Sequence, residues 1–359
     1  MGLVRSVFKD MGNAMLDKRS RQVLHAVVQC YINNPEPVGS RYVTKKYELG
    51  FSPATIRNIM ADLEEFGFLS QPHTSAGRVP TDKGYRFFVD TLHLPEDSTR
   101  QGEVSSEFVH RFTGKLQVIK DDMSVLFSEV TSTLSTLSHY VSVALPPKPE
   151  NTTFNRMELI KYKKSMVIAI LLTDEGIFRN RMVNIPEDVT QDDLNRITDF
   201  INAEYAGYSL DEIRRAIVLR MKYEKVLWDK LVSKAIDICQ QALHVAEEAV
   251  FISSLYDVMD LPDFSDIAHI KELSRAINDK HMMLRLLEEF SGSEGVKVVI
   301  GEENPIEDLK SLSVVTSTYK ESEKPIGVIA LIGPKRMNYA KAISIVDMVA
   351  RCVSKTFGS

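Results

Sequence analysis

The sequence predicts an α+β protein in which a compact helical unit with one short β-hairpin precedes longer regions of mixed helix and strand. Three observations indicate this fold class. Amphipathic segments with clear start and stop residues follow one another over the first 92 residues, a hairpin pattern comes after the third of them, and runs rich in valine and isoleucine recur from residue 141 onward. With 359 residues, the chain is long enough for two or three domains with buried cores.

The composition is that of an ordinary globular protein and excludes several classes. Nowhere do about 18 apolar residues run together, so no membrane-spanning helix is predicted. The three cysteines, Cys30, Cys239 and Cys352, are far apart and odd in number, which favours a reducing cytoplasm over a disulfide framework. The eight histidines lack HxxxH spacing and the cysteines lack CxxC spacing, so neither a metal site nor a cofactor is predicted.

Residues 1–15 are expected to be an N-terminal extension of the first domain, and Met11 or Met15 could equally be the start of the protein. The extension has basic residues but no sustained apolar core, which argues against a secretory signal. MGLVRS fits a loose lipidation pattern, but no polybasic patch supports that interpretation.

The first predicted helix covers DKRSRQVLHAVVQCYI, because five apolar residues fall on one of its faces: Leu24, Val27, Val28, Tyr31 and Ile32. PEPVGS must then be a loop, with Ser40 placed as the N-cap of a short second helix. This helix, RYVTKKYELG, is expected to end at Gly50.

The third predicted helix begins with an N-cap serine, Ser52, followed by Pro53 at its first position, and it ends at Gly67. One face is apolar and is expected to pack into the core: Ile56, Ile59, Met60, Leu63 and Phe66. The opposite face carries Ala54, Asn58, Ala61 and Glu65, with Thr55 and Arg57 on its flanks. Two alanines let another surface approach closely, Asn58 has the donors and acceptor that suit adenine, and Arg57 can reach guanine or a phosphate. The alternative is an ordinary amphipathic helix with a solvated face.

The segment after this helix decides between the two interpretations. Phe68–Ser70 predicts a short strand, Val79 begins a returning strand, and Ser75–Arg78 is the expected hairpin tip. Thr81 then N-caps a last helix with four apolar residues: Tyr85, Phe87, Phe88 and Val89. Three helices, a hairpin and a helix form a winged helix-turn-helix, in which Arg78 would project toward the DNA backbone or minor groove.

Other chemistry in the wing is not supported. His73 and Ser75 lack an orienting partner for a catalytic triad, and the loop has too few glycines for a phosphate cradle. We therefore expect no catalytic residue and no enzyme activity. His73 and Thr74 become candidates for touching DNA, and Gly77 for making the turn. The complete set of expected DNA-binding residues is Ser40, Ser52, Ala54, Thr55, Arg57, Asn58, Ala61, His73, Thr74 and Arg78.

Charge is distributed unevenly along the chain. Residues 1–92 hold 12 lysines and arginines against 9 aspartates and glutamates, whereas the remainder holds 32 against 40. A basic N-terminal part on an acidic body is compatible with a nucleic-acid-binding module on a regulatory domain.

Beyond a polar linker at residues 93–104, heptad-like spacing from Val109 to Leu137 predicts one long helix. This helix could pack between subunits or inside one subunit. VSVALPP is expected to be a strand, and RMELIKY, SMVIAILL and IFRNRMV are expected to be three antiparallel strands with a turn at Asp174–Gly176. These three strands could form their own sheet or belong to that of the flanking region.

Residues 188–250 are predicted to be mostly helical, with Trp228 in a core or an interface. VKVVIGEEN, SVVTSTY and PIGVIALIG follow as expected strands, and AKAISIVDMVARCVSKTF as the last helix. The turn GPKRMNY before that helix is either a structural connection or an anion site; it matches no phosphate-loop or dinucleotide motif.

The run PVGSRYVTKKYELGFSPATIRNIMADLEEFGFLSQPHTSAGRVPTDKGYRFFVD resembles the HrcA family of heat-inducible transcription repressors. VVIGEEN, SVVTSTY and IGVIALIGPKRMNY also match the family, and the resemblance covers residues 16–357. It implies a winged-helix domain at 16–92, a GAF-like domain formed by 105–150 and 252–357, and an inserted dimerising α/β domain at 151–251.

The resemblance further implies a cytoplasmic, homodimeric repressor of heat-shock genes that binds the inverted-repeat CIRCE operator in double-stranded DNA. It also implies dependence on the chaperonin GroEL and no membrane association. The alternative function is a small-molecule-responsive regulator that uses the GAF-like domain as its sensor. That alternative requires a deep pocket with converging polar groups.

Overall fold

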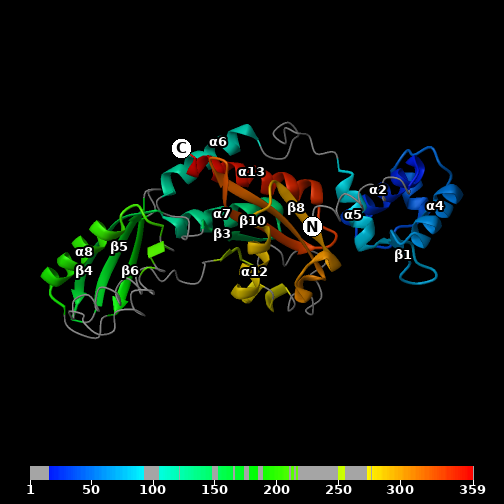
Figure 1. Cartoon of the computed structure of the whole chain (residues 1–359). Helices are drawn as coiled ribbons and strands as arrows, with labels where there is room; N and C mark the ends of the chain where they lie inside the picture. The colour runs from blue at the N-terminus through cyan, green and yellow to red at the C-terminus, as the bar shows by residue number, and fades with distance from the viewer. Residues whose placement is uncertain are drawn as a thin grey trace.

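The structure is a computed structural model, and it describes residues 16–92, 105–120, 122–147, 153–164, 166–173, 178–184, 189–209, 212–213, 216, 250–254, 273–275 and 277–358. Figure 1 shows an elongated chain with a helical head at one end, a larger sheet in the middle and a smaller sheet at the other end. The head comprises residues 16–92. The predicted N-terminal extension lies outside the described residues.

The head has the predicted order of elements. They are α2 (Lys18–Asn33), α3 (Ser40–Lys46), α4 (Pro53–Glu65), β1 (Leu69–Ser70), β2 (Val79–Pro80) and α5 (Asp82–Asp90). The two strands pair antiparallel, with Leu69 opposite Pro80. Most residues of the predicted inward faces meet in one apolar core, in which Leu24, Ile56 and Phe88 are almost completely buried. Phe66 is an exception: it was predicted to pack into this core, but it follows the last residue of α4 and is 44% exposed.

Local start signals position most of these helices. Side chains of Asp17, Ser52 and Thr81 accept hydrogen bonds from the first turns of α2, α4 and α5 respectively. The second predicted helix is present as α3, but its predicted N-cap was wrong, because Gly39 occupies the N-cap position and Ser40 is the buried first helical residue. This helix also ends earlier than expected, at Lys46.

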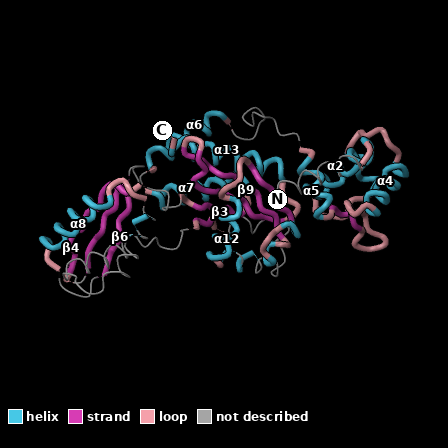
Figure 2. The backbone as a smooth tube through the Cα atoms, viewed as in Figure 1, coloured by secondary structure: helices cyan, strands magenta, loops and turns pink. Residues whose placement is uncertain are grey.

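The central sheet has five strands in the order β7-β3-β10-β9-β8, and every neighbouring pair is antiparallel. The strands are β3 (Val141–Leu145), β7 (Phe251–Ile252), β8 (Val296–Ile300), β9 (Leu312–Glu321) and β10 (Lys324–Pro334). Two 3₁₀ turns, Gly301–Glu303 and Glu307–Leu309, connect β8 to β9. Figure 2 shows these strands as the central magenta group. All strand runs that the sequence predicted for this region are confirmed.

Helices cover both faces of this sheet. Alternate residues of β10 point to opposite sides, so Ile329 and Leu331 pack with α6 (Ser106–Ile119), α7 (Met123–Ser138) and α13 (Tyr339–Phe357). Val328 and Ala330 pack instead with α12 (Lys280–Phe290). Figure 1 shows α13 and α12 on opposite sides of the strands.

The single long helix predicted between Val109 and Leu137 is wrong, because the chain forms α6 and α7 as separate helices. Asp122 begins the second one by accepting hydrogen bonds from the backbone N–H groups of Ser124 and Val125. The apolar residues of both helices pack on the sheet of the same chain, which supports the interpretation of a core inside one subunit.

The three strands after residue 150 form a second sheet that is separate from the first. Its order is β4-β5-β6, with β4 (Phe154–Lys163), β5 (Met166–Thr173) and β6 (Phe178–Asn184), and both pairs are antiparallel as predicted. Helix α8 (Gln191–Tyr205) packs on one face. The expected turn at Asp174–Gly176 and the position of Trp228 lie outside the described residues.

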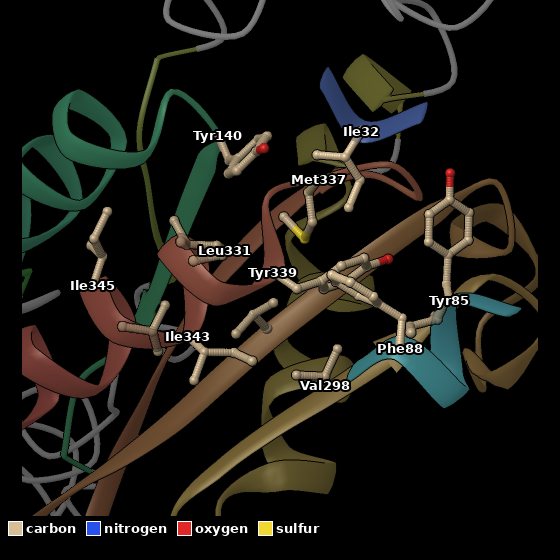
Figure 3. Close-up of a cluster of buried hydrophobic side chains, with 14 of the residues drawn as sticks. Ile32, Tyr85, Phe88, Tyr140, Val298, Leu331, Met337, Tyr339, Ile343 and Ile345 are labelled. Atoms are coloured by element: carbon tan, nitrogen blue, oxygen red, sulfur yellow. The ribbon is translucent and has the colours of Figure 1, made fainter. Parts of the chain in front are cut away.

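The head is bound to the five-stranded sheet by helix α5 and the turn between β10 and α13. Figure 3 shows Tyr85 and Phe88 of the head beside Tyr339 and Val298, with Ile32 close to Met337. The Tyr85 and Tyr339 ring centroids are 6.1 Å apart. This apolar contact is continuous with the cores of both parts.

Polar bonds surround that apolar contact. Lys335 Nζ lies 2.8 Å from Asp82 Oδ1, and Arg336 donates a hydrogen bond of 3.0 Å to the Ile32 carbonyl. Lys335 and Arg336 belong to the GPKRMNY turn, whose Asn338 also caps α13. The contacts support the structural interpretation of this turn, because its cations already have partners.

Candidate nucleic-acid interface

Helix α4 presents the predicted polar face to solvent. Ala54, Arg57, Asn58 and Ala61 are exposed, while Ile56, Met60 and Leu63 are buried beneath them. The side chains of Arg57 and Asn58 make no hydrogen bond or ion pair with any residue that the structure describes. Figure 1 shows α4 on the side of the head turned away from the five-stranded sheet, so the rest of the described chain leaves this face open.

The electrostatics of α4 favour its N-terminal half as the contact surface. Asp62 and Glu65 are exposed in the C-terminal half and would repel phosphates. The free N–H groups and the positive end of the helix dipole lie at Ser52 and Pro53, where they attract anions. A DNA duplex is therefore best accommodated across the first two turns, where recognition helices commonly meet base edges.

Ser52 and Thr55 serve the start of this helix. Ser52 Oγ accepts a hydrogen bond of 3.1 Å from the Thr55 backbone N–H, and the two hydroxyl oxygens are 2.9 Å apart. Both hydroxyls thus support the helix terminus, and they lie close enough to its free N–H groups to face a phosphate as well.

Substitutions of Ser52 separate its effect on the stability of α4 from its effect on DNA binding. We expect Ser52→Ala to lower the free energy of unfolding by about 1 kcal/mol because it removes the cap. Ser52→Asp should retain the stability, since aspartate caps as well as serine, yet weaken DNA binding by adding a negative charge. Urea unfolding followed by circular dichroism measures the first effect, with Glu65→Ala as the exposed control. Equal stability of the alanine and aspartate variants would contradict the capping role.

Helix α3 contributes a basic surface that sequence reasoning missed. Arg41, Lys45 and Lys46 are exposed, and the helix packs directly against α4. Tyr42 is 46% exposed beside them, with Lys46 Nζ 5.5 Å from its ring centroid. In helix-turn-helix proteins the first helix of the pair crosses the DNA backbone, so these side chains suit phosphate contacts. The RYVTKK run was the available signal. Ser40, which was predicted to touch DNA, is only 8% exposed.

The turn at the wing tip covers residues 73–76 and so lies earlier in the chain than the predicted tip of Ser75–Arg78. The Ala76 backbone N–H donates a hydrogen bond of 2.8 Å to the His73 carbonyl, which closes the turn. Gln71 Nε2 donates to the carbonyls of Thr74 and Ala76 and braces the loop from inside. His73 and Thr74 are exposed at this tip, as expected for residues that reach toward DNA.

Gly77 and Arg78 lie at the base of the wing instead of at its tip. The backbone of Arg78 pairs with that of Val38, with hydrogen bonds of 2.9 Å in both directions. The predicted turn role of Gly77 is wrong, because the turn closes between His73 and Ala76, before Gly77. A Cβ at Gly77 would lie 2.5 Å from the Val38 carbonyl, so close backbone approach requires glycine here.

The Arg78 side chain does not project freely. Its Nη2 lies 2.8 Å from Glu64 Oε2 on α4, and only 19% of the side chain is exposed. The structure therefore exposes Ala54, Arg57, Asn58 and Ala61 on α4, which packs against the basic helix α3, while the Arg78 side chain pairs with Glu64.

The described residues contain neither a candidate metal site nor a helix that could cross a membrane. Within these parts of the chain, no three histidine, cysteine, aspartate or glutamate side chains gather closely enough to hold a metal ion. None of the helices within the described ranges combines the length and the apolar character needed to cross a membrane.

Comparison with known proteins gives consistent results. The family described as HrcA protein C terminal domain matches residues 124–343. A heat-inducible transcription repressor HrcA of Thermodesulfovibrio yellowstonii is 47% identical, over 96% of this chain and 99% of the relative. A protein of the same name from Geobacter sulfurreducens is 37% identical, over 95% of this chain and 98% of that protein.

One solved structure has a similar overall fold. It is described as a hypothetical protein at 2.2 Å resolution and matches with a TM-score of 0.64, over 96% of this chain and 99% of that chain. The sequences are 24% identical, so the likeness concerns the fold alone.

Proposed function

The chain belongs to the HrcA family of heat-inducible transcription repressors, and from this premise we propose that it binds an inverted-repeat operator in double-stranded DNA as a homodimer. The operator would be the CIRCE element upstream of chaperonin and related heat-shock genes. Each winged-helix head would take one half-site, and repression would follow from steric block of transcription.

One observation supports this proposal above the others. The first turns of α4 present Arg57 and Asn58 without intramolecular partners among the described residues, beside the exposed cations of α3. This combination provides hydrogen-bonding groups for base edges and separate charges for phosphates, which are the two components of specific DNA binding.

The smaller sheet supports a dimer. On the face of this sheet that α8 does not cover, large apolar side chains are exposed in neighbouring strands, among them Ile160 (44%), Tyr162 (54%) and Met182 (59%). Ile160 lies opposite Ile168, which in turn lies opposite Met182, so the three residues form a continuous row. An apolar face of this kind suits a second copy of the chain, and the sheet would then act as an inserted dimerising domain within a GAF-like domain.

The proposal includes dependence on the chaperonin GroEL. Heat would divert the chaperonin to unfolded proteins, and repressor activity would fall. This part rests on membership of the family.

Fluorescence anisotropy with the purified full-length chain tests the function. A labelled inverted repeat, the same repeat with scrambled half-sites, and added GroEL form the three arms. We expect binding to the intact repeat at least about a thousandfold tighter than to scrambled DNA at physiological salt, and a larger active fraction with chaperonin. Equal affinity for both DNAs would reject sequence-specific repression. Sedimentation of the free protein tests the dimer independently.

A further inference from the structure

We infer that Arg78 is a positioning residue, which holds the wing, the loop before α3 and the recognition helix α4 in one arrangement and does not itself contact a phosphate. This inference rests on the proposed DNA binding and concerns how the surface of the head is kept in shape.

The side chain of Arg78 is committed to α4. Its Nη2 lies 2.8 Å from Glu64 Oε2, and the two side chains are only 19% and 33% exposed. The Arg78 Nε atom is buried and has no hydrogen-bond partner among the described residues, so the guanidinium is enclosed on that side. Turning Arg78 outward to a phosphate would leave the half-buried Glu64 carboxylate without its counter-charge, which is costly.

The backbone of Arg78 is hydrogen-bonded to the loop before α3. Hydrogen bonds of 2.9 Å run from the Arg78 N–H to the Val38 carbonyl and from the Val38 N–H to the Arg78 carbonyl. Val38 lies two residues before Ser40, the first residue of α3, and it is 3% exposed. Because Gly77 packs directly on the Val38 and Pro37 backbone, the base of the wing is fixed in position against the loop that precedes α3.

One residue thus joins the two helices of the helix-turn-helix and the wing. The backbone of Arg78 holds the start of α3, and its side chain holds the last turn of α4. Recognition of base edges requires side chains placed to within about 0.5 Å, so a shift of α4 against α3 would weaken specific binding. The exposed His73 and Thr74 remain available for the DNA backbone.

The deciding experiment compares Arg78→Ala, Glu64→Ala and the double variant by anisotropy on the inverted repeat. The inference predicts that each single variant loses about tenfold in affinity and that the double variant loses no more than either, because both remove the same contact. A phosphate role for Arg78 predicts the opposite for Glu64→Ala, which removes a negative charge and frees the arginine. Affinity of Glu64→Ala equal to or above that of the wild type overturns the inference. The neighbouring Glu65→Ala is the matched control and should lose nothing.

The dependence of affinity on salt concentration distinguishes the loss of a phosphate contact from a general loss of structure. Loss of one phosphate contact reduces the slope of log K against log salt by about 0.9. We expect an unchanged slope for Arg78→Ala and a reduced slope for the exposed Arg41→Ala. A reduced slope for Arg78→Ala overturns the inference. Arg78→Lys, which can still pair with Glu64, should recover most of the affinity.

Folding of each variant is verified by circular dichroism. If alanine at position 78 or 64 unfolds the head, Glu64→Gln is tested in its place. A lower affinity of Glu64→Gln for the inverted repeat then supports the inference, and an affinity equal to or above that of the wild type overturns it. Failure of the wild type to prefer the inverted repeat would reject the proposed function instead, so the two failures are distinguishable.

Discussion

Alanine at Asn58 or Arg57 is expected to weaken binding to the inverted repeat by about 1–3 kcal/mol, which is about 5- to 150-fold. Both side chains are exposed on the first turns of α4, and neither has a hydrogen-bond partner among the described residues. Their removal leaves the fold of the head intact, because the buried face of the helix is unchanged. The loss is measured by anisotropy on the operator and on DNA of random sequence.

The comparison between the two DNAs identifies the role of each residue. Removing a side chain that contacts a base edge should lower the affinity for the operator more than the affinity for random DNA. Removing a side chain that contacts a phosphate should instead lower both affinities equally and reduce the slope of log K against log salt. Lys45→Ala serves as the matched control on the adjacent helix and should show the second pattern. Equal losses on both DNAs for Asn58→Ala would rule out base reading by this residue.

Much of this surface was predictable because its signals are local. Ser52 followed by Pro53 predicted the start of α4, and the spacing of Ile56, Met60 and Leu63 predicted which face is buried. Each of these effects depends on residues within one or two helical turns. The exposed face then followed from the same periodicity.

Contacts between distant segments could not be predicted in the same way. The pairing of Arg78 with Glu64 depends on how the hairpin folds back on α4, and a one-letter sequence contains no signal for that register. The sequence interpretation therefore placed Arg78 at the tip and aimed it at DNA. Ser40 was misplaced for a similar reason, because the Val38–Arg78 bridge sets where α3 begins.

The break between α6 and α7 shows the limit of periodicity. Ile119 and Met123 are four residues apart, so the apolar spacing continues through the turn as if one helix continued. Only Asp122, a suitable N-cap, distinguished two helices from one. Because both helices pack on the same sheet, each keeps the spacing of a buried face.

The contact between the head and the five-stranded sheet was wholly outside the reach of the sequence interpretation. Arg86 on α5 donates to both carboxylate oxygens of Glu303 and to the Val298 carbonyl, across more than 200 residues of chain. Burial alone would lower the pKa of Arg86, but hydrogen bonding and the charge of Glu303 raise it above the ordinary value, so the guanidinium stays charged. Glu303 also accepts a hydrogen bond of 2.9 Å from the Ile300 backbone N–H, which orients it toward the head.

Replacing Arg86 with methionine should therefore release the head from the sheet. Methionine retains the apolar stem but removes the charged donors, and we expect a loss of about 1.5–3 kcal/mol in the free energy of unfolding. Glu303→Gln should cost less, because the amide oxygen can still accept from Arg86. The exposed pair of Arg156 and Glu158 offers a control, and Arg156→Ala should change the stability by less than about 0.5 kcal/mol.

The same variant tests whether docking sets the geometry of DNA binding. In the proposed dimer, two fixed heads would present α4 at one separation, so the wild type should discriminate sharply between operators with different half-site spacing. If Arg86→Met frees the heads, operators lengthened or shortened by two base pairs should bind almost as well as the natural spacing. The affinity for a single half-site should stay the same, because Figure 1 shows α4 on the other side of the head from α5. Unchanged spacing discrimination in a variant with reduced stability would mean that the apolar contact of Tyr85 with Tyr339 is sufficient to orient the head.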